Sequence, residues 1–247
     1  MLIYLRRYFA VMPVLYHFIT IFALRYQVGY VYLAAAVLVA LLIITQRGAN
    51  LKADIALAQR IAVLGAIGLS CAFILSIEKI EMLVDKGHVA SCSLSPVVAC
   101  SPVIASPQAS AFGFSNTFLG LFGFAAVLTA GMTLLAAGGM NGKLQLAKAW
   151  WRTLLAGIAF GAGFCVWLFY QGVFNIGKLC LYCMLVWLVT TSLLWLVAAH
   201  CVENKYVNFG KAINKLLSFK YELMVSTFVL IFLLIFARWS DYWLGLF

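Results

Sequence analysis

Charged side chains are scarce in this sequence of 247 residues: Asp, Glu, Lys and Arg make up 10% of it, and seven residues are acidic. Hydrophobic residues account for 66%, and the mean hydropathy is +1.06. A soluble globular domain has about 25% charged residues, so this composition excludes that class. The sequence also lacks recurrent ten-residue segments of alternating hydrophobicity, which argues against a transmembrane β-barrel. We therefore predict an all-α integral membrane protein.

Apolar stretches long enough to cross a bilayer as helices recur along the chain. They cover residues 8–24, 28–46, 61–80, 117–138, 150–172, 180–200 and 221–237. The first is short and contains Pro13 and His17, so it either spans the membrane or lies in its interface. The sequence lacks a small-residue cleavage site between Arg7 and Arg25, which argues against a cleaved signal peptide.

Basic residues predict the orientation, because cytoplasmic segments are rich in Lys and Arg. Most of the 17 basic residues fall in segments that alternate onto one side: the N-terminus and the connections 47–60, 139–152 and 201–220. We predict that this side is cytoplasmic and that the protein is a multi-pass protein of the inner (plasma) membrane. The net charge of +10 then reflects the orientation of the protein in the membrane and the attraction of its cytoplasmic loops to anionic lipid. We expect no nucleic-acid partner.

Four of the seven cysteines fall on the other, outer side. Cys92 and Cys100 lie in the connection of about 86–115, and Cys180 and Cys183 begin the sixth span. The compartment outside a bacterial plasma membrane is oxidising, so both pairs can form disulfides. Gly177 can end the preceding helix, which would put Cys180 in the first turn of the next, where the helix dipole stabilises a thiolate. Cys183 would lie on the same face, one turn deeper.

Other interpretations of these residues remain open. A C-x-x-C pair can be half of a zinc site, but a second such pair and an H-x-H are missing, and we predict no metal. Cys92 and Cys100 alone could form an inert structural disulfide. Two further groups receive no role: three cysteines expected to behave as small hydrophobes (Cys71, Cys165 and Cys201), and three acids expected to be solvated (Glu78, Glu81 and Asp85).

The cysteines stand in a recognisable context. The segment "SCSLSPVVACSPVIASPQASAFGFSNTFLGLFGF" (91–124), followed by "CLYCMLVW", resembles the bacterial vitamin K epoxide reductase homologues, over about residues 60–237. The shared motifs are a Cys-x7-Cys loop, a segment rich in Ser and Pro that leads to F-G-F-x-N and G-x-x-G-F, and a C-x-x-C that opens a helix. These homologues are membrane quinone reductases that drive disulfide formation.

The resemblance implies a fold and a set of site residues. The fold is a four-helix bundle around a quinone with a fifth helix outside it, here with an extra N-terminal helical pair. Residues 51–247 would form the family domain, and residues 1–50 a membrane hairpin of unknown role. The implied catalytic residues are the active-site pair Cys180 and Cys183 and the shuttle pair Cys92 and Cys100; the implied quinone-binding residues are Asn116 and Trp187.

Asn116 and Trp187 match the family pattern to different degrees. Asn116 matches the polar group that addresses a quinone carbonyl, although taken alone an asparagine at this position is more typical of a helix cap. Trp187 stands where the animal enzymes have a tyrosine, so a second hydrogen bond to the quinone is in question, while its ring can still pack on the quinone.

The predicted function is oxidation of an extracytoplasmic thioredoxin-like protein, with electrons passed to a ubiquinone or menaquinone in the lipid. Many relatives carry a thioredoxin-like domain after the fifth helix, whereas this chain ends at Phe247, so we expect a separate partner protein. One alternative is reduction of vitamin K or its epoxide. Another, from a different class, is a membrane subunit without catalysis whose cysteines form structural disulfides.

The sequence also predicts an order for the four sulfurs. Cys92 lies in the more hydrophilic part of its loop, so we expect it to be better exposed than Cys100 and to meet the partner. Cys100 would then attack Cys180, the nearer sulfur of the active-site pair. The loop itself is expected to be irregular, with one short helix near 107–112 and with "SPVIASP" anchored in the interface.

Overall fold

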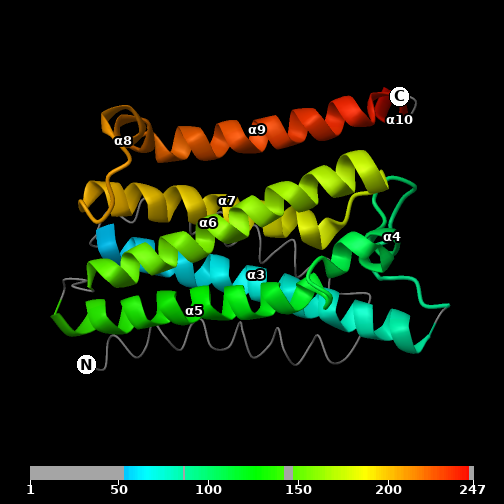
Figure 1. Ribbon diagram of the computed structural model, residues 1–247, viewed down its shortest axis with the longest axis horizontal. Helices are drawn as coiled ribbons and strands as arrows, with labels where there is room; N and C mark the ends of the chain where they lie inside the picture. The colour runs from blue at the N-terminus through cyan, green and yellow to red at the C-terminus, as the bar shows by residue number, and fades with distance from the viewer. Residues whose placement is uncertain (1–52, 86, 142–146, 245–247) are drawn as a thin grey trace.

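The computed structural model describes residues 53–85, 87–141 and 147–244. Five long helices run along its length (Figure 1): α3 (Ala53–Val84), α5 (Asn116–Asn141), α6 (Lys148–Tyr170), α7 (Leu181–Glu203) and α9 (Lys220–Arg238). Each of the five is long and apolar enough to cross a membrane. No strand occurs among the described residues. The fold is therefore that of an all-α integral membrane protein, as predicted.

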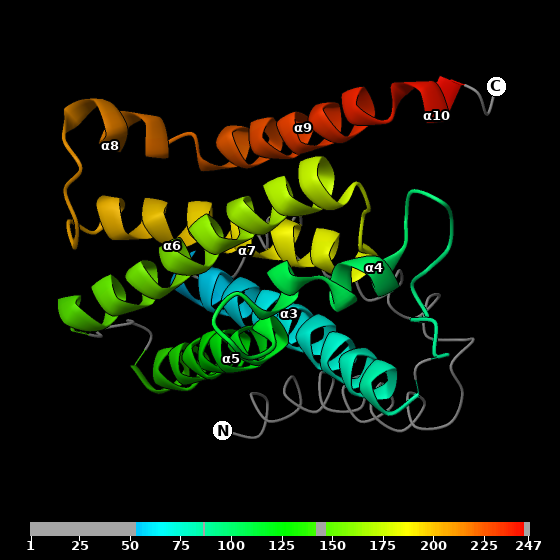
Figure 2. The same ribbon diagram turned by 45° about the vertical axis from the view of Figure 1, so that its right-hand side comes forward.

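Each of the five spans predicted from residue 61 onward corresponds to one of these helices, although α3 begins at Ala53, eight residues before the predicted start of its span. The spans predicted at 8–24 and 28–46, and the hairpin predicted for 1–50, lie outside the described residues. Helices α3, α5, α6 and α7 form the bundle, and α9 runs along one side of it against α7 (Figures 1 and 2). In the described residues α9 buries none of its side chains, as expected of a helix that faces lipid along most of its surface.

Short helices occupy the two ends of the bundle (Figure 2). At one end lies α8 (Lys211–Leu217). At the other end lie α10 (Ser240–Leu244) and the connection between α3 and α5, which contains α4 (Cys100–Ala105) and a 3₁₀ turn, η1 (Pro107–Ser110). The predicted short helix near 107–112 corresponds to η1, whereas α4 was not predicted. This end carries all four cysteines of the two pairs.

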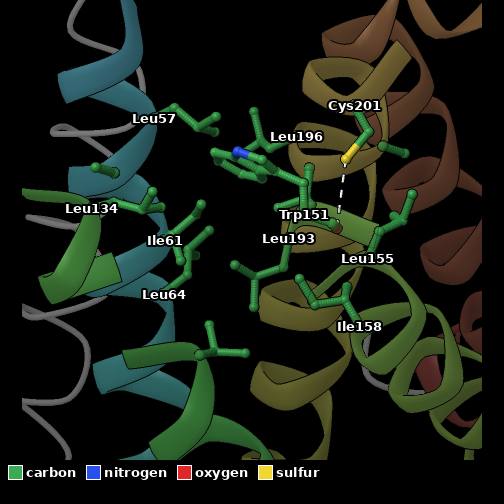
Figure 3. Packing of buried hydrophobic residues seen from close by; sticks show 14 of the residues in the cluster. Leu57, Ile61, Leu64, Leu134, Trp151, Leu155, Ile158, Leu193, Leu196 and Cys201 are labelled. Atoms are coloured by element: carbon green, nitrogen blue, oxygen red, sulfur yellow. Dashed lines mark hydrogen bonds between the residues drawn. The ribbon is translucent and has the colours of Figure 1, made fainter. Parts of the chain in front are cut away.

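A hydrophobic core fills the bundle at the end away from these cysteines (Figure 3). Trp151 is fully buried there, and its ring lies 4.2 Å from that of His200. The Cys201 thiol points to the Trp151 carbonyl oxygen at 3.8 Å, which fits the small-hydrophobe interpretation of this cysteine. The core thus anchors the helices at one end and leaves the other end for the site.

Helices α3 and α5 pack closely against each other, and glycines make this possible. A Cβ atom added at Gly131 of α5 would lie 2.5 Å from the Ala62 backbone nitrogen of α3. Small residues at such crossings let two backbones approach, and packing then holds the helices together in lipid.

Gly131→Ala should therefore push α3 and α5 apart. We expect the free energy of unfolding to fall by about 1–3 kcal/mol, as for overpacking in other cores. Thermal unfolding in detergent measures this. Gly123→Ala is the matched control, because it lies on the same helix and a Cβ there meets nothing within 4 Å. Equal unfolding temperatures for the two variants would contradict the close-packing argument.

Candidate active site

The C-x-x-C pair begins helix α7. Helix α6 continues as a π-helical turn, η2 (Gln171–Ile176), and ends at Gly177, whose φ of +67° is left-handed. Cys180 is the N-cap of α7 (Leu181–Glu203), and its sulfur accepts a hydrogen bond from the Cys183 backbone N–H at 3.4 Å. A sulfur in this position faces the N-terminal end of the helix, where backbone N–H groups are unpaired. The predicted helix break is confirmed, and Cys180 lies one position before the first turn in which it was predicted.

A short backbone pairing docks the cysteine loop onto the start of α7. Val98 and Leu179 form a parallel bridge, in which the Ala99 N–H donates to the Leu179 carbonyl and the Leu179 N–H donates to the Val97 carbonyl, both at 2.9 Å. The Lys178 ammonium donates to the Pro96 carbonyl at 2.5 Å. Because a cysteine follows each side of the bridge within two residues, this pairing brings Cys100 and Cys180 together.

The two cysteine pairs meet through one contact. Cys92 and Cys100 form a disulfide, whereas Cys180 and Cys183 are free thiols. The Cys180 sulfur lies 3.2 Å from the Cys100 sulfur. Thiol–disulfide exchange begins when a thiolate attacks one sulfur of a disulfide, so this distance suits exchange between the pairs. This contact joins the two sulfurs that the sequence predicts to exchange, and the order of the transfer steps stays a prediction.

The predicted exposure of Cys92 is wrong. Cys92 and Cys100 are both fully buried, with 0% of their surface exposed. The hydrophilic neighbours of Cys92 turn their hydroxyls to protein partners instead of to solvent. Ser91 bonds to Glu78, and the Ser93 hydroxyl lies 3.2 Å from that of Ser101. The disulfide is left on the inside of the loop, against an apolar cluster that includes Cys71.

The environment of Glu78 also differs from the prediction. We predicted a solvated side chain, but Glu78 is 1% exposed. Its carboxylate accepts hydrogen bonds from the Ser91 N–H at 3.1 Å and from the Ser91 hydroxyl, and it pairs with His88 Nε2 at 2.8 Å. The bond to Glu78 is the main reason that the pKa of His88 is raised. His88 also lies 3.2 Å from Glu81, which is half-buried, whereas Asp85 is exposed as predicted.

A cavity of about 120 Å³ lies beneath the cysteine loop, between α3, α5, α6 and α7. Its wall is mostly apolar and includes Cys180 and Cys183, together with Asn116 and Trp187. The other polar groups in the wall are Ser106, Gln108, Ser115, Thr117, Gln171 and Lys178. A largely apolar cavity with a few polar groups is typical of a site for a small lipid-soluble ligand.

Asn116 is the first residue of α5 (Asn116–Asn141), and its side chain braces the 3₁₀ turn above the cavity. The amide nitrogen donates to the Gln108 carbonyl at 2.7 Å, and the amide oxygen accepts from the Ala111 N–H at 3.1 Å. A primary amide has a second N–H, which leaves Asn116 one donor for a ligand. Trp187 is buried, and its ring packs edge-on against Phe169 at 5.0 Å between centroids.

Comparison with known families gives one match: the model of the vitamin K epoxide reductase family covers residues 60–198. This region is more than half of the chain and contains both cysteine pairs and the cavity. The chain belongs to the vitamin K epoxide reductase family. No curated protein and no solved structure matches the chain.

Membership of this family assigns the general chemistry. Vitamin K epoxide reductases are oxidoreductases, and the family couples disulfide redox chemistry to quinones. The apolar cavity beside Cys183 fits such a ligand, because a quinone ring is flat, apolar and able to accept hydrogen bonds at its oxygens. In this family member one end of the described bundle therefore combines a disulfide, a pair of free thiols and a largely apolar cavity.

Sequence reasoning missed several residues that shape the site. Lys79 donates to the Ile104 carbonyl at 2.8 Å and so helps to hold α4 (Cys100–Ala105) in place. Cys165, which received no role, lines the cavity and points to the Thr190 hydroxyl at 3.8 Å. The contacts of both residues depend on helix packing, which local sequence patterns do not specify.

Proposed function

We propose that this vitamin K epoxide reductase homologue oxidises the thiols of a separate thioredoxin-like protein and passes the electrons to a membrane quinone of the ubiquinone or menaquinone type. The observation that carries the proposal is the 3.2 Å contact between the sulfurs of Cys100 and Cys180. It joins a loop disulfide to a thiol pair that lines the cavity. Neither pair alone could transfer electrons from an aqueous protein to a ligand in lipid.

The first half of the cycle reduces the loop pair. A thiolate of the partner attacks Cys92, forms a mixed disulfide with it and releases Cys100 as a thiolate. The second thiol of the partner resolves the mixed disulfide and leaves Cys92 and Cys100 reduced. The partner leaves with its own disulfide, so two electrons and two protons have entered the protein.

The second half delivers these electrons to the quinone. Cys100 attacks Cys180 of an oxidised Cys180–Cys183 pair and releases Cys183; Cys92 then attacks Cys100 and releases Cys180. The two thiols transfer two electrons and two protons to the quinone, directly or through a short-lived adduct, and close again as a disulfide. The described structure has an intact loop disulfide and free Cys180 and Cys183, which is the state expected just before quinone reduction.

Two cavity residues are proposed to address the quinone. The free N–H of Asn116 can donate to a quinone oxygen, where negative charge develops during reduction. Trp187 lines the same cavity and can pack on the ring.

We further propose that the cysteine end of the bundle faces the extracytoplasmic side. The opposite end carries the basic residues Arg60, Arg152, Lys205, Lys211, Lys215 and Lys220, as the positive-inside rule expects of a cytoplasmic end. This orientation would place the four sulfurs in the oxidising compartment, where disulfide transfer to a partner is useful.

Anaerobic quinol formation tests the proposed function. The purified protein is mixed with a reduced thioredoxin-like protein and with ubiquinone, menaquinone or a vitamin K analogue, and quinol absorbance is followed. Cys201→Ala is the matched control, because this buried cysteine lies at the opposite end of α7 and should leave the rate unchanged. No quinol with any of the three would overturn the proposal in favour of structural disulfides.

The loop must open if the partner is to reach Cys92, since this sulfur is fully buried. We expect proteolysis between residues 87 and 115 to be several-fold faster when the Cys92–Cys100 disulfide is reduced, because the disulfide restrains the loop. Cleavage in the connection 204–210, at the other end of the bundle, is the internal control. Equal rates of loop cleavage in the two redox states would argue against a redox-coupled opening.

A further inference from the structure

Three metal-ligating side chains converge beside the cysteine loop, outside the cavity. Glu78 and Glu81 lie one turn apart on α3, and His88 comes from the loop that follows. The ligand atoms of the three lie within 4.8 Å of one another. His88 Nε2 is 2.8 Å from Glu78 Oε2 and 3.2 Å from Glu81 Oε2. These groups take no part in the proposed electron path.

We propose that Glu78, Glu81 and His88 bind one divalent transition-metal ion of the Zn²⁺ class, and that the bound ion holds the cysteine loop closed. The role of the metal ion in keeping the loop closed rests on the proposed function, whereas the binding of the ion itself does not. Zinc ligands at about 2.0–2.1 Å in a tetrahedron lie about 3.3 Å apart. The two separations from His88 are close to this value, so small side-chain rotations would open space for the ion.

The surroundings of Glu78 orient it as a ligand. The Ser91 N–H and hydroxyl both bond to Oε1, which leaves Oε2 directed at His88. Outer hydrogen bonds of this kind fix the orientation of metal ligands and strengthen binding. Among the described residues, His88 is the cation within ion-pairing distance of this buried carboxylate. A dication would balance both carboxylates with a neutral imidazole.

The donor set and the exposure favour zinc over other ions. One imidazole and two carboxylates suit Zn²⁺ with a water as the fourth ligand, whereas Ca²⁺ needs six to eight oxygen ligands. The side chains of His88 and Glu81 are 24% and 37% exposed, which gives the ion a path from solvent and room for that water.

A metal at this position would restrain the residues that cover the disulfide. It would tie α3 to His88, four residues before Cys92, and strengthen the attachment that Ser91 already makes to Glu78. Because the sulfur of Cys92 is buried, any partner needs this segment to move. The bound ion should therefore lower the rate of loop opening without touching a sulfur.

Binding of Zn²⁺ and Co²⁺ to the full chain in detergent, without a histidine tag, tests the site. We expect one equivalent to bind, with Co²⁺ absorption free of the intense near-ultraviolet bands of thiolate ligands. Glu81→Gln and His88→Ala should weaken binding by more than about a hundredfold, and Ser91→Ala by about ten- to a hundredfold. His200→Ala and Glu203→Gln are matched controls, because both residues lie near the end of α7 that is remote from the cysteines. These variants should bind the metal ion as the unmodified protein does.

Absence of saturable binding, thiolate bands with Co²⁺, or unchanged affinity in both Glu81→Gln and His88→Ala would overturn the site. Hydrogen exchange of residues 87–99 then tests the restraint: Zn²⁺ should slow exchange several-fold in the unmodified protein and not in His88→Ala. Binding without slower exchange would overturn the loop effect. Neither measurement uses quinone or partner, so a failure of quinol formation would not be mistaken for a failure of this site.

Discussion

Replacement of Cys183 by alanine is expected to lower the rate of quinol formation by more than about a thousandfold, because the Cys180–Cys183 disulfide, whose closure delivers the two electrons, can then no longer form. In this variant the Cys180 thiolate still lies beside the loop disulfide, 3.2 Å from the Cys100 sulfur. It can attack Cys100 and release Cys92. The product is a Cys100–Cys180 disulfide, and the total number of thiols and disulfides is unchanged.

Mass spectrometry of a non-reducing digest measures this product, after alkylation of the released Cys92 thiol to prevent reversal. Cys201→Ala serves again as the control and should yield the Cys92–Cys100 cross-link, as the unmodified protein does. A dominant Cys92–Cys180 cross-link in Cys183→Ala would reverse the roles of the loop cysteines. Full quinol formation in this variant would remove Cys183 from the electron path.

Asn116→Ala should slow quinone reduction by roughly ten- to a thousandfold, the range expected when one oriented donor to a developing oxyanion is lost. The variant also loses the two bonds that brace η1 (Pro107–Ser110) over the cavity. Single-turnover quinol formation from prereduced protein measures the chemical step. Reduction of the Cys92–Cys100 disulfide by dithiothreitol, measured separately, reports on the loop.

The matched control is Asn208→Ala, at the other end of the bundle. The Asn208 side chain also makes two hydrogen bonds, and its oxygen accepts both, from the Gly210 N–H and from the Asn214 amide. It should leave both rates unchanged. If Asn116→Ala forms quinol as fast as the unmodified protein while its loop is reduced faster, Asn116 is a brace and addresses no quinone.

The transmembrane part of the fold could be predicted from the sequence because lipid imposes a simple rule. A spanning helix needs about 20 apolar residues, and all five such runs became helices. Four of them match the expected ends within a few residues, whereas α3 begins at Ala53, eight residues before the expected start at residue 61. Helix α4 (Cys100–Ala105) escaped prediction because the Ser, Pro and Gly content of the loop predicted an irregular segment, and Pro102 lies inside this helix. A proline in the first turn is tolerated, since its missing N–H would have had no partner inside the helix.

The two wrong predictions at the site, for Cys92 and Glu78, share a cause. The sequence shows which segments are polar, but it does not show which way their side chains point in the folded protein. Glu78 falls on the same helical stripe as the buried residues Cys71, Ile74 and Leu75, at spacings of three and four. This pattern could have indicated that its carboxylate points inward. The burial of Cys92 had no such local signal, because it depends on where the loop folds back.

The buried loop disulfide separates this protein from the bulk thiols of its surroundings. Small reductants that collide with the closed protein meet no sulfur of this pair, so under the proposed function they would not feed electrons through it to a quinone. If a partner protein binds only when the loop is open, as proposed, its apparent affinity is the intrinsic affinity multiplied by the open fraction. An open fraction of about 1% would then weaken binding about a hundredfold. The choice between competing thiol proteins would then depend on which of them binds the short-lived open form of the loop, and less on which of them recognises the closed form.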